Sequence, residues 1–167
     1  MKVKFEGSGE LEAALRNLGN RVTAKNVAKR ALTKAAEPIR DRARSLAPDD
    51  PATGMGKFLR DSIKTAPGRR SRGDRVWALV GIDSEVDPVR YVDRKSGRGD
   101  YRDPGVAGVA VIMEFGAPAN NIPAQPFMRP AWEAEKLSAP ERIATELRDE
   151  IDKSAARAAR KAARSKK

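Results

Sequence analysis

The sequence contains no cysteine and no histidine. Disulfides, thiol nucleophiles, zinc sites of the Cys/His kind and mechanisms that need an imidazole are therefore excluded. Because a chain without cysteine is indifferent to redox conditions, the missing thiols do not indicate a compartment. Any chemistry has to come from carboxylates, amines, hydroxyls or phenols.

Large apolar side chains are scarce as well. Leu, Ile, Val and Phe make up about 19% of the chain, close to the level below which chains are commonly disordered. No stretch approaches the ~20 consecutive apolar residues that a membrane span needs, and the first residues lack the apolar core of a signal peptide. We expect a modest core, no membrane partner, and a protein that stays in the cell unless it leaves as part of an assembly.

Charge of one sign is abundant at the C-terminus. The net charge is +11, and residues 153–167 contain seven basic and no acidic residues. Such a cluster attracts either nucleic-acid phosphate or an acidic partner, whereas the alternative is a solvated, poorly ordered end. Both remain open, and without an interleaved aromatic residue any nucleic-acid contact is expected at the backbone. The candidate contact residues are Lys153, Arg157, Arg160, Lys161 and Arg164.

The N-terminal third is predicted to be mainly helical. Apolar residues at helical spacing predict one helix over 11–18 and a longer one over 24–47. Thr23 is expected to cap the longer helix, and Pro38 is expected to bend or interrupt it. Residues 2–6 alternate apolar and charged side chains, which predicts a short strand.

The remainder of the chain alternates predicted strands and loops. Residues 76–82 and 109–115 are the predicted strands, separated by a long polar loop over 83–105. Four prolines make residues 116–130 extended rather than regular. The S-x-x-E sequence at 138–141 matches a capping box and predicts the start of a last helix.

These elements predict an α+β fold. We expect a small, mainly antiparallel sheet packed on the 24–47 helix, followed by a C-terminal helical extension. The corresponding domains are a core over residues 1–137 and a helix with a basic tail over residues 138–167.

Candidate catalytic groups are few. Asp83, Glu85 and Asp87 alternate and could hold a divalent cation on one strand face, but a solvated loop is the favoured interpretation. Asp49 and Asp50 are adjacent in a proline-flanked turn, which favours a helix-ending turn. We therefore predict no catalytic residue, no metal site and no cofactor.

Several motifs follow one another in an order known from one protein family. Residues 43–48 read Ala-Arg-Ser-Leu-Ala-Pro, followed by Thr-Gly at 53–54 and Leu-Arg-Asp-Ser-Ile at 59–63. Glu-Phe-Gly follows at 114–116, and Pro-Ala-Gln-Pro-Phe-Met-Arg-Pro-Ala at 123–131. The chain thereby resembles the tail-completion or neck proteins of long-tailed bacteriophages, the family typified by the tenth gene product of a lambda-like coliphage.

The resemblance covers roughly residues 25–135 and implies a virion component rather than an enzyme. It implies a homo-oligomeric ring at the head–tail interface, assembled in the host cytoplasm, that contacts the tail tube or tail terminator and the head–tail connector. The family motif and interface residues that it implies are Pro48, Thr53, Gly54, Leu59, Arg60, Glu114, Phe115, Gly116, Pro126, Phe127 and Pro130.

Two of these motifs also have a physical interpretation. Glu114-Phe115-Gly116 is expected to end a buried strand, with Phe115 anchored in the core and Gly116 allowing a sharp turn. The prolines around Phe127 stiffen the segment, so that presenting this ring to a pocket costs little entropy. The pocket lies either in the domain's own core or on a neighbouring subunit.

A basic nucleic-acid-binding protein, such as a packaging or nucleoid protein, is the alternative function. Composition favours this alternative because of the basic C-terminus. The order of the motifs favours the phage neck protein.

Overall fold

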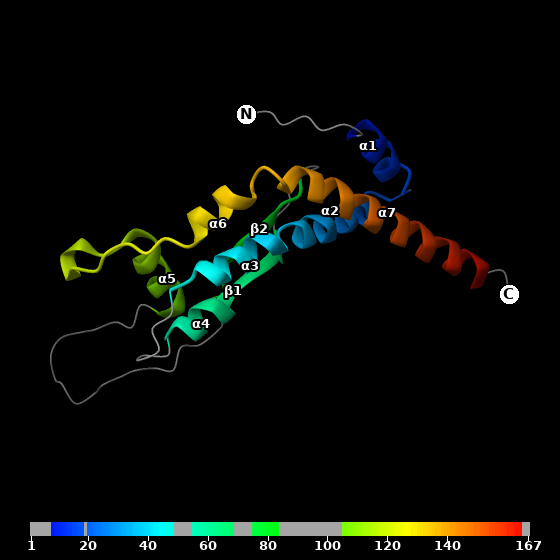
Figure 1. The fold of residues 1–167 in the computed structure, drawn as a ribbon. Coiled ribbons are helices and arrows are strands. Elements are labelled where there is room, and N and C mark those ends of the chain that lie inside the picture. Colours follow the sequence, from blue (N-terminus) through cyan, green and yellow to red (C-terminus); the bar gives the residue numbers. More distant parts are fainter. Residues whose placement is uncertain (1–7, 19, 49–54, 69–74, 84–104, 165–167) are drawn as a thin grey trace. The chain divides into compact units, whose positions relative to one another are not determined.

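The computed structural model describes residues 8–18, 20–48, 55–68, 75–83 and 105–164, which are mostly helical (Figure 1). Its helices and strands are, in chain order, α1 (Ser8–Arg16), α2 (Arg21–Ala35), α3 (Glu37–Leu46), α4 (Met55–Ser62), β1 (Ile63–Pro67), β2 (Ala78–Ile82), α5 (Gly105–Phe115), the 3-10 helix η1 (Pro118–Asn120), α6 (Met128–Glu135) and α7 (Ala139–Arg164). Helices with one small sheet and a C-terminal helix confirm the predicted α+β class.

The chain divides into two compact units. The first, here called the α1–α2–α7 unit, comprises residues 1–37, 65–79 and 135–167, and the second, the α3–α6 unit, comprises residues 38–64 and 80–134. The expected domain boundary at residue 138 lies one residue before the start of α7 and stays a prediction.

In the α1–α2–α7 unit, α7 packs along α2, and α1 contacts both helices. The core of this unit is formed by four buried residues, and three leucines and one alanine that are partly buried pack against them. The buried residues are Leu11 of α1, Val27 of α2, and Ala144 and Ile151 of α7.

The capping residue of α2 is Asn20 and not Thr23: its side chain accepts a hydrogen bond of 2.8 Å from the Val22 N–H. The helix therefore begins three residues earlier than predicted.

In the α3–α6 unit, a single apolar cluster joins α3, α4, β1, α5 and α6. The predicted interruption of the 24–47 helix is confirmed: α2 ends at Ala35 and α3 begins at Glu37, with Pro38 in the first turn of α3. Fully buried Phe127 and Ile63 are the largest side chains of the cluster. Its buried members are Ala43, Ala47, Leu59, Ile63, Val106, Ala110, Phe127 and Ala131.

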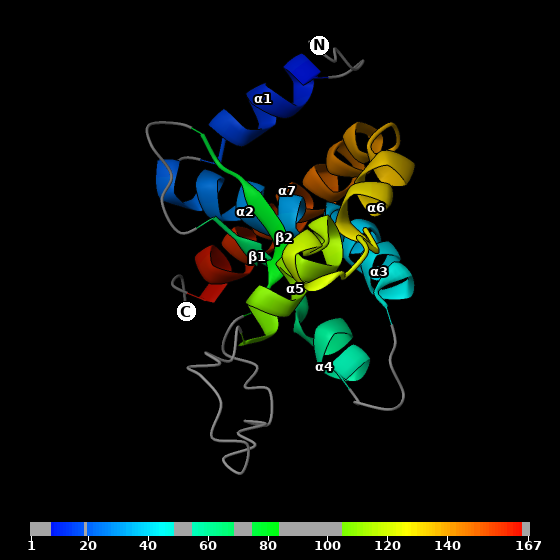
Figure 2. The same ribbon diagram turned by 90° about the vertical axis from the view of Figure 1, so that its left-hand side faces the viewer.

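The two strands lie side by side and run antiparallel (Figure 2). The Asp83 N–H donates to the Ser62 carbonyl at one end, and the Gly68 N–H donates to the Trp77 carbonyl at the other. The predicted alternation over 76–82 is confirmed, because Val80 and Ile82 pack on the core, whereas Trp77 and Leu79 are exposed.

The predicted strand at 109–115 is wrong, because these residues belong to helix α5. Its continuous apolar run does not distinguish a buried strand from a buried helix. In the helix every fourth residue is buried, and these residues are Val106, Ala110 and Glu114. The predicted strand at 2–6 lies outside the described residues, as does most of the predicted 83–105 loop.

The C-terminal elements follow the predictions in part. Helix α6 begins at Met128, with Pro130 in its first turn, and α7 runs for 26 residues. Ser138 precedes α7, but its hydroxyl donates to the Glu135 carbonyl (3.1 Å) instead of forming the predicted capping box. Among the described helices none is both long and apolar enough to cross a membrane.

Candidate interaction surfaces

Glu114, near the end of α5, caps the N-terminus of α6. Its carboxylate accepts the backbone N–H groups of Phe127 (2.8 Å), Met128 (2.9 Å) and Arg129 (3.1 Å). The Arg129 side chain closes the arrangement, since Nε donates to the same carboxylate (2.9 Å) and Nη2 donates to the Glu114 carbonyl (2.7 Å). N–H groups that have no partner within the first turn of a helix are thus satisfied by a carboxylate from another helix.

The carboxylate of Glu114 is nearly inaccessible, with 6% of the residue exposed. Burial by itself raises the pKa of this group, but the N–H groups of Met128 and Phe127 and the two donors of Arg129 outweigh it and hold the pKa below its ordinary value. Glu114 is therefore a charged structural residue inside the unit.

Gly116 permits the sharp reversal after α5, as predicted. Its φ is +77°, and a Cβ there would lie 3.0 Å from both the Ala124 nitrogen and the Ile122 oxygen. The Gln125 N–H then donates to the Met113 carbonyl (2.7 Å), which holds the returning segment against the end of α5. The Glu-Phe-Gly motif and the proline-rich motif thus form one local structure.

Phe127 occupies the unit's own core. Its side chain is completely buried in the apolar cluster with Leu59 and Ile63. Of the two alternatives that the sequence leaves open, the structure shows the internal pocket. The flanking Pro126 and Pro130 are exposed.

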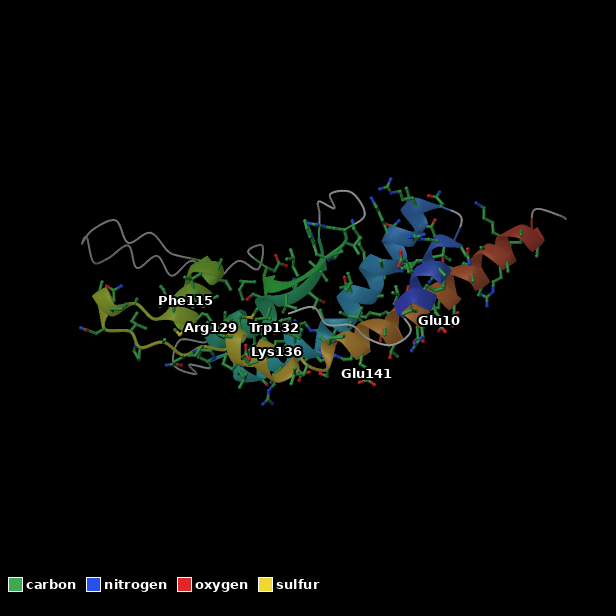
Figure 3. All side chains as sticks on the ribbon, turned by 90° about the horizontal axis from the view of Figure 1, so that it is seen from above. Glu10, Phe115, Arg129, Trp132, Lys136 and Glu141 are labelled. Carbon is green, nitrogen blue, oxygen red and sulfur yellow. The ribbon has the colours of Figure 1, made fainter. Side chains whose placement is uncertain are left out.

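Phe115 was expected in the core, and this expectation is wrong because 64% of the residue is exposed. The guanidinium of Arg129 lies 5.0 Å from the centroid of its ring (Figure 3). Val111, one turn earlier on α5, and Trp132, one turn after Arg129 on α6, are 59% and 51% exposed. We call Val111, Phe115, Arg129 and Trp132 the α5–α6 surface.

Two of the remaining motif residues, Leu59 and Arg60, lie in α4 just before β1. Leu59 is buried in the cluster, and Ser62 beside it is completely buried, with its hydroxyl donating to the Leu59 carbonyl (2.6 Å). Arg60 and Pro48 are half-buried. Thr53 and Gly54 lie outside the residues that the structure describes.

A buried charge cluster in the α1–α2–α7 unit escaped sequence reasoning. Glu150 of α7, 3% exposed, accepts hydrogen bonds from Arg30 Nε (2.7 Å) and Lys34 Nζ (2.9 Å) of α2. The Arg30 guanidinium first, and the Lys34 ammonium second, lower the pKa of Glu150 to about 2. The sequence signal for this cluster is a glutamate next to Ile151, which belongs to the apolar stripe of the helix. A glutamate at the solvent-facing edge of a helix gives the same sequence pattern, so the signal does not identify a buried acid.

Five of the seven basic residues over 153–167 belong to α7. Helix α7 continues to Arg164, and Lys153, Arg157, Arg160, Lys161 and Arg164 are all exposed on it. Lys153 Nζ lies 3.7 Å from Glu150 Oε1. Among the described residues, no carboxylate pairs with the four cations that follow.

Of the candidate catalytic carboxylates, only Asp83 lies in the described part of the chain. Asp83 accepts a hydrogen bond of 2.6 Å from Lys64 across the sheet. Asp49, Asp50, Glu85 and Asp87 lie outside the described residues. No group of three or more Asp and Glu within the described ranges could hold a metal ion.

The comparisons with known proteins bear on this arrangement. A family model described as "Bacteriophage HK97-gp10, putative tail-component" matches residues 9–94. The matched residues contain α1 from its second residue, α2 to α4, both strands and the motifs at 43–48 and 59–63. The motifs at 114–116 and 123–131 lie beyond them. No curated protein and no solved structure matches the chain. The family match covers more than half of the chain, which therefore belongs to the HK97-gp10-like family of bacteriophage tail components.

Proposed function

We propose that this tail component is a tail-completion or neck protein that forms a ring at the head–tail joint of a long-tailed bacteriophage. A tail component belongs to the virion and contacts other virion proteins. In the ring each copy contacts the next, while the ring meets the tail tube or tail terminator on one side and the head–tail connector on the other. The role is structural and uses no catalytic residue. The order of the motifs over residues 43–131 supports this position in the tail.

The observation that carries the proposal is the exposed α5–α6 surface. Glu114 is the only charged residue of α5, and it is buried, so the outer side of this helix is entirely apolar. Exposed apolar patches rimmed by polar residues mark interaction sites, and Trp and Arg are enriched among the residues that dominate interfaces. The occupant that we propose is the neighbouring copy in the ring, since a contact between different surfaces of successive copies closes into a ring.

The capping arrangement at Glu114 supports this role because it fixes the surface before assembly. Arg129 is bound to Glu114 and at the same time stacks on Phe115, so two members of the surface are positioned by one buried carboxylate. A preorganised surface loses little conformational entropy when a partner binds.

Mass measurement of the purified chain in solution tests the proposal. The intact chain should form one closed oligomer, and the double variant Val111→Asp/Phe115→Asp should remain a single folded chain, because both side chains are exposed. Leu137→Asp is the matched control, since Leu137 is apolar, 82% exposed and outside the α5–α6 surface. An intact chain that stays monomeric, or a double variant that still closes, contradicts the proposed ring.

A further inference from the structure

The cations of α7 form one face of the helix. Residues in an α-helix are rotated by about 100° from one to the next, which places Lys153, Arg157, Arg160, Lys161 and Arg164 within an arc of about 100°. We call these five residues the basic face. With a rise of 1.5 Å per residue, the face is about 17 Å long.

Four of the five cations of the basic face have no counter-charge among the described residues, whereas Lys153 lies 3.7 Å from Glu150 Oε1. The last acidic residue of α7 is Asp152, and none follows it in the sequence. Arg30 and Lys34 are bound by Glu150, whereas Arg157, Arg160, Lys161 and Arg164 pair with no carboxylate that the structure describes. The last turns of α7 also extend past the ends of α1 and α2, as Figures 1 and 3 both show.

The other side of the same segment indicates the class of ligand. Apart from its cations, residues 154–164 consist only of alanine and one serine. A protein partner is normally held by aromatic or large aliphatic anchors, and unpaired bases are held by aromatic rings that stack on them. This segment has no such anchor and is suited to contact by charge alone.

We infer that the basic face of α7 binds the phosphate backbone of duplex DNA without sequence preference. Duplex DNA carries about one negative charge per 1.7 Å of its axis, so a face about 17 Å long meets several phosphates at once. This inference goes beyond the proposed structural role and does not depend on ring formation, because every residue of the face belongs to one copy.

Fluorescence anisotropy with a 25-base-pair duplex of arbitrary sequence tests the inference, with Kd measured between 50 and 200 mM salt. The intact chain should bind, and log Kd should rise linearly with log salt. The variant Arg157→Gln/Arg160→Gln/Lys161→Gln/Arg164→Gln should bind at least about tenfold more weakly at 50 mM salt and lose about three to four units of the slope. The melting temperature should change little, since all four side chains are exposed.

A second variant separates the basic face from net charge. Arg157→Ala with Ala159→Arg, and Arg164→Ala with Ala162→Arg, keep the composition and charge but move two cations to the opposite side of the helix. The slope should then fall by about two units. A slope equal to that of the intact chain overturns the assignment to this face, and an intact chain that does not bind duplex DNA at 50 mM salt overturns the choice of DNA over an acidic protein surface.

Discussion

Glu114 binds Arg129 through three hydrogen bonds that join the end of α5 to the start of α6. The backbone N–H and Nε of Arg129 donate to the Glu114 carboxylate, and Nη2 donates to the Glu114 carbonyl. These contacts join two residues that lie 15 positions apart in the sequence and belong to two different motifs. The glutamate of Glu-Phe-Gly binds the arginine of Pro-Phe-Met-Arg-Pro, so the two motifs occur together because they form one structure.

Glu114→Gln should destabilise the α3–α6 unit by about 1.5–3 kcal/mol, the usual range for hydrogen bonds to a charged group. The amide can replace some of the accepted bonds but removes the charge that Arg129 and the helix N-terminus require. Urea denaturation measures the change. Glu141→Gln, an exposed change in α7, is the control and should alter the free energy of unfolding by less than about 0.5 kcal/mol. Equal effects of the two substitutions would contradict the capping role.

Phe127→Ala and Phe115→Ala form a matched pair. Phe127 is completely buried, and its truncation should lower the free energy of unfolding by about 3–5 kcal/mol. Phe115 is exposed and stacks on Arg129, so its truncation should lower it by no more than about 1 kcal/mol. Thermal and urea unfolding of both variants measure the difference. A larger loss of free energy of unfolding for Phe115→Ala than for Phe127→Ala would contradict the burial of Phe127.

Gly116→Ala should destabilise more than Gly105→Ala. Both glycines have positive φ, so alanine costs about 1 kcal/mol or more at each position. Only at Gly116 would a Cβ also meet backbone atoms at 3.0 Å, whereas the space at Gly105 is open. Gly9 lies in helix α1 with no atom within 4 Å of its Cβ position, and Gly9→Ala should stabilise by up to about 1 kcal/mol. Three unfolding curves test this ranking.

Glu150 should make stability depend on pH under acidic conditions. Its pKa falls from the ordinary 4.5 to about 2 in the folded chain, so its stabilisation is present above pH 4.5 and is lost as the pH falls towards 2. Glu150→Gln should remove about 1.5–3 kcal/mol near pH 7 and abolish this part of the pH dependence. Glu146, which lies 3.7 Å from Lys34 and is more exposed, is the control: Glu146→Gln should cost less than about 1 kcal/mol. If the free energy of unfolding changed with pH in the same way for the parent and for Glu150→Gln, the proposed stabilisation by this carboxylate would be ruled out.

Local signals in the sequence predicted several elements correctly. Pro38 interrupts the long helix because proline lacks the N–H that a helix interior needs. This effect does not depend on what the helix packs against. Strand β2, which spans Ala78–Ile82, was predicted over 76–82 because the alternation of that segment separates a core face from an exposed face. Asn20 and Thr23 are both favourable capping residues, so the three-residue error at the start of α2 reflects a choice that local sequence does not decide.

Tertiary contacts decided the rest. The apolar run of α5 fits a strand or a helix, and its valines favour a strand by propensity. As a helix, it places Glu114 on the same buried side as Val106 and Ala110 and leaves Phe115 outside. A buried glutamate next to an exposed phenylalanine reverses the usual order, and the reason lies in the N–H groups at the start of α6, which no local pattern in α5 reveals.

The position of the chain in the phage particle tests the central claim most directly. The measurement is electron microscopy of particles in which the chain carries a gold-labelled tag after Lys167. The account predicts label at the joint between capsid and tail, on every tailed particle. Label spread along the tail tube or gathered at the distal tip, or tailed particles that carry none, would contradict it.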